Sequence, residues 1–423
     1  MVYRKNGGDA HHNYLSGGGH GEGVSREAEF ATELFRDYYR RAPPPAPADL
    51  GAREFGFMFF ERDFVRRHLG FAEENDLRRF LVNHVPSHVY CSSALYDRPA
   101  APTMDLKGWR GADLIFDLDA DHIRGAEGLS YEDMLALVKK EAMALVDRFI
   151  LGAFGFDERD VLICFSGGRG YHIHVRDPRV RGLGAHERGE IIDFVTGTDL
   201  DVGMLFPSAA VMRKDLKEKV RVERAFKVPG KDEGGWRLFG REAVERVAKE
   251  VAVMSAQGLR ERYPFLERAK DATLDEMRRS LHDRRGEATG LELILREDSL
   301  EYITSDRAKE LFIEMVMRTL KDRMAGQIDE PVTRDVKRLI RLPGSLHGKT
   351  GLRVVPLRRD QMDAFDPLRD AVPETFPDAP TKVVLKERTD IRIRDCRVRG
   401  AGEVEVPAYA ALFLVLRKGA TLA

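Results

Sequence analysis

Acidic and apolar residues alternate in one short segment, Asp113-Leu-Ile-Phe-Asp-Leu-Asp119. This period of two predicts a half-buried β-strand with Asp117 and Asp119 on the same face. Their Cα atoms would lie roughly 6–7 Å apart, so the two negative charges repel unless a cation lies between them. Hard divalent ions prefer oxygen ligands of this kind. The pair therefore predicts a divalent-metal site, and the alternative is a solvated acidic strand edge.

A glycine-rich turn follows, in the segment Phe165-Ser-Gly-Gly-Arg-Gly-Tyr-His-Ile-His-Val175. Gly167 and its neighbours allow backbone N–H groups to approach an anion closely. Ser166 and Arg169 add a hydroxyl and a guanidinium that suit phosphate oxygens, and His172 follows on the next strand. The segment predicts a phosphate-binding turn. The alternative is a glycine-rich hairpin with exposed histidines.

A third carboxylate, Asp329, precedes the basic segment Arg341-Leu-Pro-Gly-Ser-Leu-His-Gly-Lys349. Tight turns at Pro and Gly would bring Arg341, His347 and Lys349 together, where they could hold several phosphate charges. The alternative is a solvated basic face. The Walker phosphate loop and the Rossmann glycine fingerprint are absent. Three carboxylates with two groups of phosphate donors are the components of two-metal phosphoryl transfer, and they suffice for a whole nucleoside triphosphate.

The elements that must position these residues alternate between strand and helix. Period-two or short apolar patterns predict strands at 89–95, 113–119, 160–165 and 171–175. Patterns with a 3.6-residue period predict helices at 25–41, 74–85 and 131–149. The alternation predicts an α/β fold with mixed sheets.

The pattern then changes along the chain. Charge-rich helical patterns occupy residues 187–323, and a β-type pattern returns from residue 332 and continues to Phe413–Val415. We therefore predict an α/β catalytic core in residues 24–186 and 324–423, with residues 187–323 as an inserted helical subdomain. Residues 1–23 are rich in Gly and His and predict a disordered tail.

The composition excludes several classes of protein. Hydrophobic residues make up 43% and charged residues 33%, with a formal net charge of −1, so overall charge does not indicate a nucleic-acid binder. The 3 cysteines are far apart and form no CxxC pair, which argues against a disulfide framework and a Cys-based zinc site. A reducing, cytoplasmic compartment is expected. No apolar run approaches the ~18 residues needed to span a membrane, so no membrane association is expected.

Three segments, in their order along the chain, resemble the three motifs of the small catalytic subunit of archaeal and eukaryotic DNA primases. They are Phe116-Asp-Leu-Asp-Ala-Asp121, the turn segment 165–175, and the segment from Arg338 to Leu352. The flanking segments are similar to the archaeal form, and the resemblance covers most of residues 28–417. It implies the archaeo-eukaryotic primase catalytic core with an inserted helical subdomain.

The resemblance also implies roles for individual residues. Asp117, Asp119 and Asp329 would be catalytic and would bind a pair of Mg²⁺ or Mn²⁺ ions. The residues implied to bind the nucleotide are Arg66, Ser166, Gly167, Arg169, His172, Arg341 and His347. Gly168 stands where many relatives carry another arginine, so one phosphate contact is missing or is supplied elsewhere. The loop 122–131 has no cysteine, although many relatives place a zinc site there, and we expect no structural zinc.

The function implied by the resemblance is that of a DNA-dependent primase, which synthesises short RNA primers on single-stranded DNA from nucleoside triphosphates during replication; DNA primers are a further option. The expected partner is the large primase subunit, which carries an iron–sulfur domain, and the expected location is the cytoplasmic, nucleoid-associated replication machinery. The alternatives are a primase-like repair polymerase that extends ends or gaps, a non-catalytic nucleotide-binding subunit, and a two-metal phosphatase or nuclease.

Overall fold

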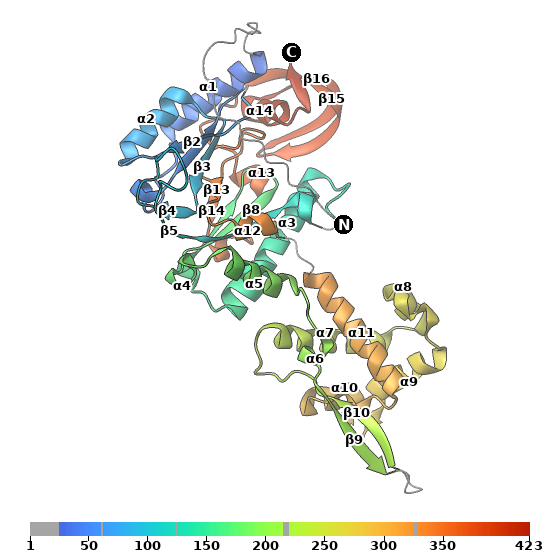
Figure 1. Cartoon of the computed structure of the whole chain (residues 1–423). Coiled ribbons are helices and arrows are strands. Elements are labelled where there is room, and N and C mark those ends of the chain that lie inside the picture. Colours follow the sequence, from blue (N-terminus) through green and yellow to red (C-terminus); the bar gives the residue numbers. More distant parts are fainter. Residues whose placement is uncertain (1–24, 61, 124, 215–219, 325–327) are drawn as a thin grey trace, which may run out of the picture.

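The computed structural model describes residues 25–60, 62–123, 125–214, 220–324 and 328–423 of the chain. It combines helices with several small antiparallel sheets, so the predicted α/β class is confirmed. Figure 1 shows two lobes. The strands that carry the sequence motifs lie in the upper lobe, and residues 202–324 lie in the lower one.

One four-stranded antiparallel sheet carries two of the motifs. Its strands pair in the order β14 (Val355–Leu357), β7 (Val161–Phe165), β8 (Gly170–Val175) and β6 (Leu114–Asp119). The strands predicted at 113–119, 160–165 and 171–175 are thus confirmed. In the register of β6 with β8, Asp117 lies opposite His172. Asp119 lies opposite Gly170, so the acidic pair lies beside the glycine-rich turn.

The apolar face of β6 belongs to the main core. Leu114, Phe116 and Leu118 are buried on this face, and helix α3 (Tyr131–Leu145) packs against β6 and β8. Burial of each such side chain stabilises the fold by about 1.5–3 kcal/mol. A shift of one residue in the register of β6 would turn the carboxylates into the core and these apolar side chains out of it. Core packing therefore fixes the face on which the acidic pair lies.

A second four-stranded sheet lies next to the first. Its strands pair in the order β13 (Leu339–Arg341), β3 (His88–Ser92), β1 (Phe55–Met58) and β2 (Arg66–Leu69). The helices α1 (Arg26–Arg41) and α2 (Glu74–His84) pack beside each other at this sheet. Ile115 of β6, Val332 of α12 (Glu330–Arg334) and Ile340 of β13 form one buried apolar cluster. This cluster holds β13 across from the acidic strand.

The C-terminal part contains a helix where the sequence pattern predicts a strand. Three strands pair in the order β16 (Cys396–Pro407), β15 (Pro380–Ile393) and β17 (Ala420–Leu422). Helix α14 (Ala408–Leu416) connects β16 to β17, so the β-type prediction for Phe413–Val415 is wrong. All residues from 408 to 415 are buried. A short run that is apolar on every side has no polar face, and its periodicity cannot separate a buried strand from a buried helix.

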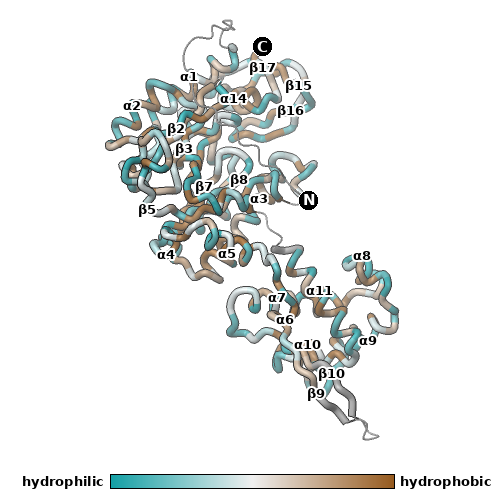
Figure 2. Tube along the Cα trace, viewed as in Figure 1, coloured by the Kyte–Doolittle hydropathy of each residue, from teal (hydrophilic) through white to brown (hydrophobic). Residues whose placement is uncertain are grey.

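Smaller elements complete the upper lobe. They are β4 (Ala94–Tyr96), which pairs with β5 (Trp109–Ala112), the π-helical continuation of α3 (Val146–Ala153), α4 (Pro178–Arg181), α5 (Ala185–Thr196) and α13 (Pro367–Asp370). Helix α5 packs against α12 beside β6. It lies with the upper lobe, although most of it falls within the range 187–323. Figure 2 shows that apolar residues gather along the strands at the centre of this lobe.

The lower lobe is mainly helical. Its helices are α6 (Val202–Leu205), α7 (Gly235–Val253), α8 (Ala256–Arg262), α9 (Asp271–His282), α10 (Gly290–Glu297) and α11 (Asp306–Met324). Two antiparallel hairpins accompany them, β9 (Ser208–Lys214) with β10 (Val220–Phe226) and β11 (Arg284–Arg285) with β12 (Ala288–Thr289). The charge-rich helical pattern does not predict the hairpins.

Two further expectations concern the whole chain. The division of the chain at residues 187 and 323 stays a prediction, and the tail predicted at 1–23 lies outside the described residues. Among the helices that the structure describes, none combines the length and the apolar character needed to cross a membrane.

Candidate active site

The three predicted carboxylates gather at the end of β6. Asp117 and Asp119 line a cleft of about 690 Å³ between the two sheets. Asp329 directly precedes α12, and its backbone N–H donates a hydrogen bond of 2.9 Å to the carbonyl oxygen of Asp117. Oδ2 of Asp329 lies 3.9 Å from Nε2 of His122, and Asp329 is not among the described residues that line the cleft. Two carboxylates thus line the cleft, and the backbone of the third is bonded to one of them.

Asp117 has a strongly perturbed pKa. Burial, together with the negative charges of Asp119 and Asp329, raises the pKa of Asp117 to about 7. A cation beside Asp117 would reverse it. Among the described residues, no three His, Cys, Asp or Glu side chains form a ready-made metal cage. Mg²⁺ is usually held by one or two carboxylates with water and substrate phosphates, so this donor set fits such an ion.

Buried ion pairing holds the beginning of β6 in place. Arg53 donates through Nη2 to Oδ2 of Asp113 at 2.8 Å, and both side chains are buried. The same guanidinium donates to the carbonyl oxygen of Ser92 in β3 at 2.7 Å. Arg188 of α5 donates to the carbonyl oxygens of Ala112 and Asp113. The acidic strand is therefore tied both to the second sheet and to α5.

The glycine-rich turn is anchored from both sides. The Ser166 hydroxyl accepts hydrogen bonds from the backbone N–H groups of Gly168 and Gly170, at 3.3 and 3.2 Å. The Thr350 hydroxyl donates to the carbonyl oxygen of Gly167 at 2.5 Å. Gly167 has a φ of +77°, and a Cβ atom there would lie 2.7 Å from Cβ of His347. Only glycine fits this position, so the turn and the third motif pack in direct contact.

Gly168 and Arg169 form the part of the turn that faces the cleft. A Cβ atom on Gly168 would lie 3.0 Å from Nε2 of His347, so a side chain at this position requires the histidine to move. Nη2 of Arg169 lies 3.5 Å from Oδ1 of Asp119 and also contacts the carboxylate of Asp121. Arg169 therefore joins the glycine turn to the acidic strand.

His172 is buried at the floor of the cleft. Its Nε2 lies 3.5 Å from Oδ1 of Asp117, and its Nδ1 has no hydrogen-bond partner among the described residues. Burial, together with the charges of Arg341 and Arg338, lowers the pKa of His172 to about 3. The imidazole is therefore neutral near pH 7. His174 is also buried, so the alternative of a hairpin with exposed histidines is wrong.

Arg341 enters the cleft from β13. Its Nη1 lies 2.5 Å from Nδ1 of His88, and its guanidinium lies 5.3 Å from the ring centre of Tyr90. Burial lowers the pKa of His88 to about 2, so its ring is neutral and Nδ1 accepts the hydrogen bond from Arg341. The same Nδ1 accepts from the backbone N–H of Gly348 at 3.2 Å. His88 thus holds both the arginine and the loop that carries His347.

Lys349, which the basic segment of the third motif predicts to hold phosphate charges, lines the cleft. Several further residues of the cleft were not among the predicted nucleotide-binding residues: Tyr90, Arg338, Thr350, Arg417 and Lys418. Arg338 belongs to the same basic run, so the sequence offered some indication of it. Tyr90 and His88 gave none, because their role depends on the pairing of β3 with β13. Arg417 and Lys418 follow the apolar run that resembles a strand, and only the helical conformation of α14 brings them here.

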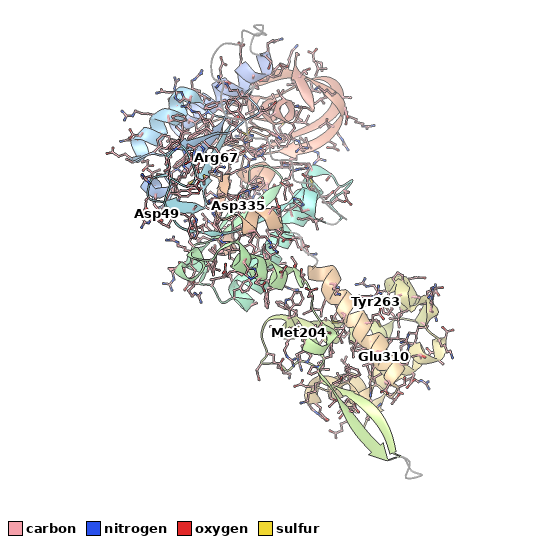
Figure 3. The ribbon with its side chains drawn as sticks, in the orientation of Figure 1. Asp49, Arg67, Met204, Tyr263, Glu310 and Asp335 are labelled. Atoms are coloured by element: carbon pink, nitrogen blue, oxygen red, sulfur yellow. The ribbon has the colours of Figure 1, made fainter. Side chains whose placement is uncertain are left out.

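Arg66 is the predicted site residue that lies elsewhere. It is exposed on β2 and is not among the described residues that line the cleft. Its neighbour Arg67, labelled in Figure 3, makes two hydrogen bonds of 3.2 Å to the buried carboxylate of Glu54. The contact of Arg66 with a nucleotide therefore stays a prediction. The other predicted residues, Ser166, Gly167, Arg169, His172, Arg341 and His347, lie in or directly behind the cleft wall.

Comparisons with known proteins show what the chain is similar to. The family model described as DNA primase small subunit matches residues 116–359. The chain is 39% identical over 401 residues to the DNA primase small subunit of Methanocella arvoryzae, covering 92% of this chain and 97% of that protein. It is 39% identical over 400 residues to that of Methanothrix thermoacetophila, covering 93% and 98%. It is 37% identical over 398 residues to that of Halorubrum lacusprofundi, covering 93% and 97%.

Proposed function

This chain belongs to the family of DNA primase small subunits, and we propose that it joins nucleoside triphosphates into short RNA primers on a single-stranded DNA template by two-metal nucleotidyl transfer. The observation that supports this most is the meeting of two sets of groups in one cleft. Asp117 and Asp119 face it from β6, while Arg169 and Arg341 face it from two other elements. A nucleoside triphosphate needs both sets, since its phosphates are bound by cations, directly or through metal ions.

The reaction forms a bond between the 3′-hydroxyl oxygen of the primer end and the α-phosphorus of the incoming nucleotide, and pyrophosphate leaves. Mg²⁺ or Mn²⁺ held by Asp117, Asp119 and Asp329 would supply positive charge at the phosphates and would make the 3′-hydroxyl more acidic. No side-chain nucleophile is needed. We propose that the carboxylates bind the metal ions and that the glycine turn binds the phosphates.

The phosphate contacts follow from the protonation states of the side chains. His172 is neutral, so it would act on a phosphate as a hydrogen-bond donor and not as a charge. Arg169, Arg341 and Lys349 carry positive charge into the cleft and would neutralise the triphosphate and the leaving pyrophosphate. Ser166 shapes the turn that presents its backbone to the ligand.

The proposal extends to partners and location. The name of the family implies a larger partner subunit, and we propose that this is the primase large subunit with its iron–sulfur domain. The template would be single-stranded DNA within the cytoplasmic, nucleoid-associated replication machinery. The absence of a structural zinc ion stays a prediction, which metal analysis of the chain without its His-rich tail would check.

Primer synthesis on single-stranded DNA with labelled nucleotides tests this function. Assays with Mg²⁺ and with Mn²⁺, with and without a large subunit, should give short products that require the template. The double variant Asp117→Ala/Asp119→Ala is the control and should give none. Extension of a supplied primer only would indicate a repair polymerase, and triphosphate binding without any product would indicate a nucleotide-binding subunit.

His88 provides a test of how Arg341 is positioned. His88→Ala removes the acceptor for the guanidinium, and a hydrogen bond to a charged group contributes about 1.5–3 kcal/mol. We expect the KM for the nucleoside triphosphate to rise about tenfold or more, with a smaller change in kcat. In His88→Asn the side-chain oxygen can replace Nδ1, so this variant should recover most of the loss. Equal KM values for His88→Ala and the unaltered chain would contradict this role.

A further inference from the structure

Two cations reach the catalytic cleft from the C-terminal end of the chain. Arg417 and Lys418 follow α14 directly, and both line the cleft together with Asp117, Arg341 and the glycine turn. Both side chains are exposed. Among the described residues, the ammonium group of Lys418 contacts no carboxylate. Its charge is therefore available to a ligand.

Arg417 is linked to the glycine turn through one aromatic side chain. Its guanidinium lies 3.8 Å from the ring centre of Tyr131. The Tyr131 hydroxyl donates a hydrogen bond of 2.6 Å to the carbonyl oxygen of Gly168. Positive charge over an aromatic ring is attracted to its face, so this contact restrains the guanidinium beside the turn.

The turn itself lacks a cation at this position. Gly168 carries no side chain, and a Cβ atom there would lie only 3.0 Å from Nε2 of His347, which leaves little room for one. Arg417 comes from a distant part of the sequence but lies over the residue that binds the Gly168 carbonyl. The structure thus places a positive charge next to the position where the turn has none.

The backbone of Lys418 is unusual for a lysine. Its φ is +62°, in the left-handed region that favours glycine. The lysine adopts this conformation, and the adjacent Gly419 does not. The backbone N–H of Lys418 donates to the carbonyl oxygen of Val415, and that of Gly419 donates to Leu414. Glycine usually occupies this position after a helix. A lysine here is conformationally costly, so the fold alone does not explain its presence.

We propose that Arg417 and Lys418 bind the distal phosphates of the incoming nucleoside triphosphate and supply the positive charge that the glycine turn lacks at Gly168. This inference rests on the proposed function. The ligand is inferred from these contacts: Arg417 lies on Tyr131, and Tyr131 is bonded to the glycine turn that faces the same cleft. Two cations that line the same cleft as the glycine turn suit the most highly charged part of the triphosphate.

Lys418→Gly tests the proposal without harming the fold. Glycine accepts the left-handed backbone, so the melting temperature should stay the same or rise. Arg417→Met keeps apolar contact with the Tyr131 ring and removes the charge. For each variant of the full chain, Kd would be measured for ATP and for AMP with Mg²⁺, and for a single-stranded DNA template. Lys382→Ala is the control, because Lys382 is exposed on β15, pairs with Glu403 at 3.3 Å and is not among the described residues of the cleft.

The expected result is a Kd for ATP that rises about tenfold in each variant, which is the loss of one charge-assisted contact. The Kd for AMP and for the template should change less than about twofold, because neither ligand carries distal phosphates. Weaker template binding with unchanged ATP binding would overturn the proposal, as would unchanged binding of all three ligands. If the unaltered chain makes primers while the variants bind ATP normally, only this inference fails. If the unaltered chain binds no ATP, the proposed function fails with it.

Discussion

Asp117→Asn is expected to lower the rate of primer synthesis by about 10³-fold or more, without lowering the melting temperature. The amide has the size of the carboxylate but no charge to hold a metal ion. Metal ions stabilise charge in the transition state by several kcal/mol, and about 1.4 kcal/mol corresponds to a factor of ten in rate. The initial rate of primer synthesis, with Mg²⁺ and with Mn²⁺, measures the loss.

The stability of this variant separates catalysis from folding. The fold disfavours the charged form of Asp117, because burial and two neighbouring carboxylates raise its pKa to about 7. A neutral amide removes that repulsion, so the melting temperature should stay the same or rise. Asp395→Asn is the matched control, since that side chain is 93% exposed and lies outside the cleft. Asp117→Asn activity within tenfold of the unaltered chain would contradict the metal-binding role.

The second large effect is on the free energy of unfolding and concerns the buried pair of Arg53 and Asp113. Asp113→Ala is expected to destabilise the fold by about 3–5 kcal/mol, because it leaves the guanidinium of Arg53 buried without its carboxylate. The pair is 2.8 Å apart, and the exposed fractions of the two side chains are only 5% and 2%. The midpoint of urea unfolding should fall clearly, and circular dichroism of the full chain measures it.

Two further variants make this test specific. Asp113→Asn keeps an oxygen that can accept from Arg53, so its unfolding midpoint should lie between those of the unaltered chain and Asp113→Ala. Asp390→Ala removes an exposed carboxylate that pairs with Arg397 and Arg399, and exposed pairs contribute little. If Asp113→Ala and Asp390→Ala unfold at the same urea concentration, the buried pair does not anchor β6.

Local patterns predicted the elements that carry the motifs. β6 alternates apolar and acidic residues, and this period alone places Asp117 and Asp119 on one face. The glycine turn is likewise set by residues adjacent in sequence, with Ser166 bonded to the N–H groups of its own loop. Such information lies within ten residues, so a single sequence contains it.

Contacts between distant segments could not be predicted in the same way. The acceptor role of His88 depends on the pairing of β3 with β13, and these strands are far apart in the chain. The position of Arg66 depends on the pairing of β2 with β1 at the edge of the second sheet. The α14 segment could not be predicted for a different reason. Its apolar residues are compatible with a buried strand and with a buried helix, and only the surrounding elements decide between the two.

The contact between α5 and α12 has a consequence for how this chain can vary. Gly189 of α5 approaches Arg334 of α12 so closely that a Cβ atom would lie 2.9 Å from the guanidinium. The chain therefore leaves the upper lobe and re-enters it at neighbouring points, with Asp329 just after the re-entry. A segment whose ends meet in this way can change in length at small entropic expense. The length of the lower lobe can thus change while the carboxylates keep their places.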